Sequence, residues 1–244
     1  MDRVKIGFFS FTEITDPGAH AAYNEWHLYD HLPEQYRIPG IAGGERWVST
    51  PACRAARTMS GALLDPIQYM TLYLMAEPVA PTLDDFMALG SRLADLGRFF
   101  GPRASHLSGP FRAVSAAAAP RVRVSDEVLP WRPARGVYVT VDDVTDASHL
   151  DDHLAHLQVD VIPAGLAVPG VAGVWNFATD SEYAKRWPTG RRRISVWYLD
   201  DDPVAVAARL APIVDRDHAA VRRIFSGPFT TIDPRDFAPG NSDS

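Results

Sequence analysis

Two pairs of short sequences repeat along the chain at nearly constant spacing. Pro39–Gly43 reads Pro-Gly-Ile-Ala-Gly, and Pro169–Gly173 reads Pro-Gly-Val-Ala-Gly 130 residues later. Ser108–Phe111 and Ser226–Phe229 both read Ser-Gly-Pro-Phe, 118 residues apart. The matches keep their order, and their offsets differ only by a few loop residues. Such a repeat indicates an internal duplication, which constrains the chain to fold as two similar units.

The first half predicts the order strand, helix, strand, strand, helix, strand. Aromatic and β-branched runs indicate the strands, and Pro39-Gly40 ends the first helix. The predicted strands are Val4–Phe11, Gly44–Ser49, Tyr69–Met75 and Ser105–Val114, and the predicted helices are Pro17–Arg37 and Thr82–Phe99.

The second half repeats this order, so each half matches the ferredoxin-like β-α-β-β-α-β unit. The predicted strands are Gly136–Val141, Val171–Ala178, Arg193–Leu199 and Ile224–Ile232, and the predicted helices are Ala147–Leu166 and Pro203–Arg222. Helices cover one sheet face of such a unit and leave the other bare. We therefore expect an α+β fold in which the two units pack together or close a barrel within one chain. The space between the sheets is then a natural apolar pocket.

These patterns divide the chain into four parts. Residues 1–115 form the first ferredoxin-like half, and residues 135–233 form the second. Between them, residues 116–134 are rich in alanine and proline and are expected to be a linker. Residues 234–244 are expected to be a flexible tail.

The first helix carries a cluster that folding alone does not require. At helical spacing, one face presents Tyr23, His27, Asp30, His31 and Glu34. Two imidazoles beside carboxylates and a phenol make a proton-transfer set.

The second half does not keep these histidines. At the offset of 130, His27 corresponds to Leu157 and His31 to Val161. We therefore expect the first half to carry the site and the second to serve as a wall.

A motif around this cluster resembles a known family. It is similar to a motif of the EthD-like branch of the dimeric α/β-barrel superfamily. The residues that carry the resemblance are Trp26, then His31-Leu32-Pro33-Glu34, then Ile38-Pro39-Gly40 and a strand with Arg46-Trp47. The resemblance implies that the end of the first helix faces a cavity and that His31 matches the family's histidine. The superfamily includes cofactor-free monooxygenases, lactone isomerases, polyketide cyclases and haem enzymes, so the fold alone does not select a reaction.

The main functional hypothesis is a cofactor-independent enzyme that acts on a small apolar carbonyl or aromatic metabolite. In a pocket between the sheet and the first helix, His31 and His27 would be general acid and base. Asp30 or Glu34 would hold an imidazole, and Tyr23 or Arg46 would stabilise oxyanion charge. The reaction would be isomerisation, cyclisation, elimination or cofactor-free oxygenation, as in a lyase, isomerase, cyclase or monooxygenase. No cofactor and no metal are expected.

Three further residues are candidates for the pocket wall. Trp26 lies beside the histidine face, Tyr73 lies on an alternating strand face, and His106 lies in the last strand of the half. Each could equally belong to the packed core or to the surface.

Two alternatives stay open. One is a haem- or metal-dependent enzyme in which His27 or His31 is a ligand, since histidines four residues apart on a helix can share a metal. The zinc-protease helix also needs a glutamate after the first histidine, and this chain has Leu28 there. The other alternative is a non-catalytic protein that binds a small molecule.

Bulk composition limits the partners. A net charge of −6 argues against a nucleic-acid or anionic-membrane surface, and the single cysteine, Cys53, allows no disulfide within the chain. No apolar run approaches the roughly 20 residues of a membrane span. We therefore expect a cytoplasmic protein with a small-molecule substrate, which associates as a homodimer.

Overall fold

The computed structural model describes residues 3–183, 185–216 and 218–237. In the first half the strands are β1 (Val4–Ile14), β2 (Ile41–Val48), β4 (Tyr69–Ala76) and β5 (Arg103–Ala118), with helices α1 (His20–Trp26), α2 (Leu32–Gln35) and α4 (Val79–Asp95). The loop between β2 and β4 adds a short helix, α3 (Pro51–Ala55), and a short strand, β3 (Met59–Ser60).

The second half repeats the arrangement. Its strands are β6 (Gly136–Val144), β7 (Val171–Thr179), β8 (Arg192–Leu199) and β9 (Val221–Thr231), and its helices are α5 (Leu150–His156), α6 (Ile162–Leu166) and α7 (Pro203–Val214). The predicted order of elements, and with it the α+β fold of two ferredoxin-like units, is confirmed.

The strands close into a barrel. Their order is β2-β4-β1-β5-β7-β8-β6-β9, and a further pairing joins β9 to β2 through Trp47 with Thr231 and Val48 with Thr230. β5 and β7 join the two halves on the other side. Closure removes the bare sheet faces and the free strand edges that a single unit would expose.

Side-chain alternation fills the barrel and sets its outer wall. Along β1, Phe9 and Phe11 point into the barrel core, whereas Phe8, Ser10 and Thr12 point outward. The inner residues are among the most buried of the protein: Phe9, Phe11, Trp47, Phe111, Trp175, Phe177, Tyr198, Phe225 and Phe229. The space between the sheets is therefore mostly core, and the cavity that holds the predicted histidines lies outside it, between the barrel wall and the helices.

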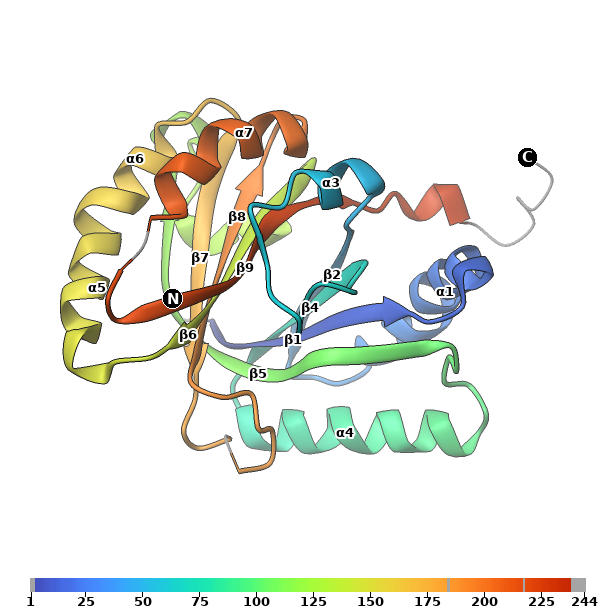
Figure 1. The fold of residues 1–244 in the computed structure, drawn as a ribbon. Coiled ribbons are helices and arrows are strands. Elements are labelled where there is room, and N and C mark those ends of the chain that lie inside the picture. The colour runs from blue at the N-terminus through green and yellow to red at the C-terminus, as the bar shows by residue number, and fades with distance from the viewer. Residues whose placement is uncertain (1–2, 184, 217, 238–244) are drawn as a thin grey trace.

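The helices pack on the outside of the barrel. Figure 1 shows α5, α6 and α7 on one side of the strands and α1 and α4 on the other. Each half thus has its own layer between helices and barrel wall. The layer of the first half contains a cavity, whereas the described residues of the second-half layer pack into a hydrophobic cluster.

Both halves contain the same irregular helical turn. The first helix is interrupted by a π-helical turn, η2 (His27–His31), in which the Leu32 N–H donates to the His27 carbonyl oxygen. The second half has the same turn, η6 (Leu157–Val161), 130 residues later. A π-turn is a rare element that often marks a functional site. Its recurrence at the offset of the sequence repeat is strong evidence of the duplication.

A tryptophan fills the second half where the first is hollow. Trp197 holds the same register position beside Tyr138 that Tyr73 holds beside Phe8. Its indole lies so close to Gly165 that a Cβ there would be 2.5 Å from the ring. The residue 130 positions before Gly165 is Gln35, which lines the hollow layer.

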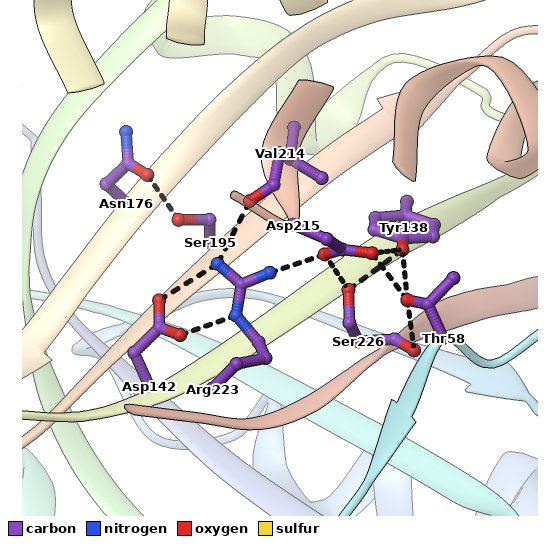
Figure 2. A network of polar contacts seen from close by, with 9 residues as sticks. All are labelled: Thr58, Tyr138, Asp142, Asn176, Ser195, Val214, Asp215, Arg223 and Ser226. Carbon is purple, nitrogen blue, oxygen red and sulfur yellow. Dashed lines mark hydrogen bonds and ion pairs between the residues drawn. The ribbon is translucent and has the colours of Figure 1, made fainter. Parts of the chain in front are cut away.

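A polar network also occupies the second half, as Figure 2 shows. The Tyr138 hydroxyl donates to Asp215 at 2.9 Å and lies 2.8 Å from the Ser226 hydroxyl. Thr58, from the loop after α3, donates to the same carboxylate. Arg223 binds Asp215 at 2.5 Å and also pairs with Asp142. The network therefore ties a loop of the first half to the second half.

Several predicted boundaries differ from the structure. The strand β5 continues to Ala118, because its last residues pair with β7. The following segment forms η3 (Pro120–Val122) and η4 (Asp126–Trp131). α4 begins at Val79 and not at Thr82, whose hydroxyl donates to the Pro78 carbonyl oxygen inside the helix.

The end of the chain is described only in part. The predicted tail begins with a short turn, η7 (Pro234–Phe237), and its remainder, residues 238–244, lies outside the described residues. Among the helices of the described ranges, none is long and apolar enough to span a membrane.

Candidate functional site

A cavity of about 380 Å³ lies between the outer barrel wall and the helices of the first half. Its size is typical of a small-molecule site. β1, β4 and β5 supply the wall residues Phe8, Ser10, Thr12, Thr71, Tyr73, Arg103, Ser105 and Ser108. The helical side supplies Tyr23, Trp26, His27, His31, Gln35, Phe86, Met87, Gly90, Ser91 and Ala94, and Phe99 closes one end.

The two histidines lie side by side in this cavity. The His27 and His31 ring centroids are 5.1 Å apart, and the side chains are only 4% and 8% exposed. Trp26 stacks on His31 at 4.6 Å, and Tyr73 is nearly parallel to His27 at 6.5 Å. Tyr23 contacts His27 edge to face. The sequence-predicted residues Tyr23, Trp26, His27, His31 and Tyr73 are therefore all brought together.

The ring nitrogens of the two histidines differ in their partners. Nε2 of His31 lies 3.3 Å from the Gln35 side-chain nitrogen, whereas its Nδ1 is buried without a partner among the described residues. Nδ1 of His27 is also buried without a partner among the described residues, and the His27 side chain lines the cavity. His27 thus offers an imidazole that no hydrogen bond to another described residue occupies.

Burial keeps both imidazoles neutral at pH 7. Burial, together with the nearby Arg103 guanidinium, lowers the pKa of His31 to about 4. Burial also holds the pKa of His27 well below its ordinary value, with smaller contributions from Arg46 and His31. A neutral imidazole is the form that binds a metal ion or accepts a proton.

The low pKa of His31 should lower the free energy of unfolding in acid. Because the unfolded chain binds this proton near pH 6.5 and the folded chain only near pH 4, stability falls as the pH drops between these values. We expect unfolding in urea at pH 4.5 to show a loss of roughly 2.5 kcal/mol from this group, relative to pH 7. His31→Gln should lose correspondingly less stability between the same two pH values. Equal losses in both proteins would contradict the assigned pKa.

Arg103 is a cavity residue that sequence reasoning missed. Its guanidinium lies 4.4 Å from the centre of the Phe99 ring and donates to the Ser105 hydroxyl at 3.2 Å. It has no carboxylate partner among the residues that the structure describes. A cation without a counter-ion in a cavity attracts an anionic group of a ligand.

Arg46 lies behind the cavity and does not line it. It donates to Asn24 at 3.1 Å, and its guanidinium lies over the rings of Tyr23 and Tyr69. Asn24 in turn donates to the Tyr69 hydroxyl. The predicted role of Arg46 as a direct oxyanion partner is therefore not supported by its position, although its charge acts on both histidines.

The structure does not place Asp30 and Glu34 in the site. Arg98 binds Asp30 at 2.8 Å and Glu34 at 3.0 Å on the outer side of the helix. The π-turn is the reason: its wider winding leaves His31 beside His27 but takes Asp30 and Glu34 off the face that regular α-helical spacing predicts. Neither carboxylate makes a hydrogen bond to a histidine, so the predicted orienting role is wrong.

His106 also lies outside the cavity. Its Nε2 is 2.7 Å from the Glu13 carboxylate. A β-bulge in β5 is the cause, because Ser108 pairs with Ser10 but Ser105 pairs with Thr12, so His106 is the extra residue. The bulge brings Ser105 and Ser108 to the same face, the one that lines the cavity.

Comparisons with known proteins give the fold but no sequence relative. No family model matches the chain, and no curated protein matches it. Among solved structures, the encapsulated dye-decolorizing peroxidase of Mycobacterium smegmatis matches with a TM-score of 0.60 and 11% identity, over 98% of this chain and 96% of that chain.

Two further structures agree with this match. A chlorite dismutase variant from Candidatus Nitrospira defluvii, solved with cyanide, gives a TM-score of 0.58 and 12% identity, covering 97% and 94% of the two chains. A Fusobacterium nucleatum protein described as a monooxygenase gives 0.54 and 9%, covering 96% and 94%. These neighbours do not show the EthD-like branch.

The comparisons correct the main functional expectation. A cofactor-independent enzyme of histidine acid–base chemistry was expected, whereas chlorite dismutases and dye-decolorizing peroxidases are haem-dependent. At the level of the cofactor, they match the haem-dependent alternative better than the cofactor-free expectation. The lyase, isomerase and cyclase classes have no counterpart among these neighbours. By its fold, the chain is a dimeric α/β barrel in which two ferredoxin-like units are joined in one polypeptide.

Proposed function

We propose that the protein is a haem-dependent oxidoreductase whose first half, residues 1–115, binds haem in the histidine cavity with His27 as the iron ligand. The observation that carries the proposal is a buried, neutral imidazole that lines an aromatic-walled cavity and makes no hydrogen bond to another described residue. The alternative ligand is His31, whose Nε2 already contacts Gln35.

The residues present fit haem better than a free metal ion. Haem iron needs only one axial histidine from the protein, because the macrocycle supplies the other ligands. A protein-bound metal ion needs three or more side-chain ligands. No such group of histidine, cysteine or carboxylate side chains exists within the described part of the chain.

The walls also suit a large flat cofactor. Phe8, Tyr73, Phe86 and Phe99 offer aromatic surface. Arg103 offers a charge that can pair with a haem propionate, because carboxylates and guanidinium groups form strong hydrogen-bonded pairs.

Haem would supply electron transfer to and from a bound oxidant or substrate. The chain's own residues would do the rest. His27 would hold the iron, and its neighbour His31, neutral at pH 7, would hold a proton at Nδ1, because its Nε2 accepts from the Gln35 amide. Arg103 would bind a propionate group of the haem. The helices α1 and α4 would exclude water from the cavity.

The comparisons support this proposal at the level of enzyme class. Two of the matched folds are named for redox reactions, a dismutase and a peroxidase, and the third is described as a monooxygenase. The His31-Leu32-Pro33-Glu34 motif suggests the EthD-like branch, which stays a proposal from sequence.

Reconstitution with haem tests the proposal. The purified protein is titrated with hemin, and the absorption spectrum is followed to saturation. We expect a Soret band that saturates at one haem per chain and peroxide-dependent oxidation of a dye substrate. Failure to reach a 1:1 endpoint would overturn the haem assignment. Binding at 1:1 without any turnover of peroxide or chlorite would favour the non-catalytic carrier over the enzyme.

A further inference from the structure

A second cavity lies at one end of the barrel interior, apart from the histidine cavity. Its volume is about 260 Å³. Glu45 and Trp47 of β2, Leu72 of β4 and Tyr198 of β8 line its inner part, and Trp131 of η4 lies at its rim. Room for a single water needs only roughly 10–15 Å³ on this measure, so the space can take a small molecule.

Glu45 is a carboxyl group inside the barrel. It pairs with Leu72 across the sheet, and Leu72 belongs to the barrel core, so Glu45 faces inward. In the described ranges, nothing makes a hydrogen bond or ion pair with its carboxyl group. Burial raises the pKa of Glu45 to about 8, so most of this group is neutral at pH 7. Glu45 is half-buried by its exposed surface, and an acid without a partner at such a position calls for an explanation.

Two hydrogen-bond donors beside Glu45 are also unused. The indole nitrogen of Trp47 and the hydroxyl of Tyr198 are both buried, and neither has a partner among the described residues. Trp47 and Tyr198 are 0% and 1% exposed. Glu45 is close enough to Tyr198 to raise the pKa of its hydroxyl, after the larger effect of burial. Buried polar groups usually find partners, so these three groups point to a missing one.

The remaining walls are aromatic. Tyr36, Trp47, Trp131 and Tyr198 all line the cavity, and Gly43 leaves room for the Trp131 indole, whose nitrogen would be 3.0 Å from a Cβ there. Trp131 already makes one cation–π contact, because the Arg3 guanidinium lies 5.5 Å from its ring centre. The lining residues include no lysine, arginine or histidine.

We propose that this barrel-end cavity binds a small organic ammonium compound that also carries a hydrogen-bond-accepting oxygen, such as an amino alcohol. The ammonium would pair with Glu45 and contact the aromatic faces, which attract cations. The oxygen would accept from Trp47 and Tyr198. This proposal does not depend on the function proposed for the histidine cavity.

An anionic ligand fits the same site poorly. A carboxylate could accept from Trp47 and Tyr198, but it would meet the negative faces of the aromatic rings and no cation among the lining residues. Ionisation of Glu45 at higher pH would repel it. The pH dependence of binding therefore separates a cation from an anion.

Calorimetric titration with choline tests the proposal. Choline has a permanent charge, so only the protein titrates. Because a cation binds the ionised form of Glu45, we expect choline to bind about 5- to 10-fold more tightly at pH 9 than at pH 7. Its neutral isostere, 3,3-dimethyl-1-butanol, should bind at least 10-fold more weakly than choline at pH 9. Tetramethylammonium, which lacks the oxygen, should fall between the two.

Two variants complete the experiment. Glu45→Gln keeps the shape of the side chain and should weaken choline binding at least 10-fold and remove its pH dependence. Glu34→Gln, on the outer side of the first helix, is the matched control and should change nothing. Absence of choline binding, equal binding of the neutral isostere, or tighter binding of acetate would overturn the proposal. If Glu45→Gln does not fold, the comparison of choline with its isostere decides on the unmodified protein.

Discussion

His27→Ala is expected to shift and weaken the Soret band of the haem-loaded protein toward the spectrum of free hemin, and to lower peroxidase turnover at least a hundredfold. The reason is geometric: the His27 side chain lines the cavity without a hydrogen bond to another described residue, and burial keeps the ring neutral. Alanine removes the iron ligand and leaves a hole of imidazole size. The measurements are the absorption spectrum after hemin titration and the rate of dye oxidation.

The second half supplies a matched control for this variant. His153 is also buried, 4% exposed, and burial likewise lowers its pKa to about 4. It packs against His218 in the filled layer and lies outside the cavity. His153→Ala should therefore lose a similar amount of stability and keep the Soret band and turnover.

Added imidazole distinguishes a ligand from a packing residue. In His27→Ala, free imidazole can enter the space left by the side chain and should restore both the unmodified protein's band position and its turnover, whereas a purely structural defect would not regain turnover. If the band shifts in His31→Ala and not in His27→Ala, the ligand is His31. If the band shifts in neither variant, the cavity of the first half is not the haem site.

The sequence predicted the architecture because the duplication left marks that survive in short strings. The offset of 130 from Pro39 and Pro169 also relates the two π-turns, His27–His31 and Leu157–Val161. Strand order followed from aromatic and β-branched runs. The loss of both histidines at Leu157 and Val161 correctly indicated that the halves differ, and the structure shows the difference as one hollow and one filled layer.

Part of the site could not be predicted because two irregularities break regular spacing. The π-turn moves Asp30 and Glu34 off the histidine face, and Arg98, distant in sequence, binds both. The bulge at His106 brings Ser105 and Ser108 to one face, where strict alternation would separate them. Neither irregularity has a sequence signal as clear as a proline or glycine.

Other site features depend on contacts between distant segments. Arg103 follows α4 by several residues and becomes a cavity residue only because β5 pairs with β1. An axial histidine for haem has no motif beyond the histidine itself, so the sequence left cofactor-dependent and cofactor-free chemistry both open. The expectation of cofactor-free chemistry was corrected only by the fold comparisons.

Trp197→Ala is expected to destabilise the protein by about 3–5 kcal/mol, the range for removing a large aromatic side chain from a core. The indole of Trp197 is 2% exposed and packs with Val161, Leu199 and Leu210 in the second layer of the fold. Gly165 already provides the space for this ring, so no neighbouring side chain is placed to refill it. The free energy of unfolding in urea measures the loss.

The equivalent position in the first half should respond differently. Tyr73 lines an existing cavity, and its hydroxyl is buried without a partner in the described part of the structure. Tyr73→Phe removes an unsatisfied polar group and should leave stability unchanged or slightly raised. A loss below about 1 kcal/mol for Trp197→Ala, under the range for a core aromatic, would mean that the second layer relaxes around the hole. The contrast between the halves, one built to hold a ligand and one packed solid, would then be wrong.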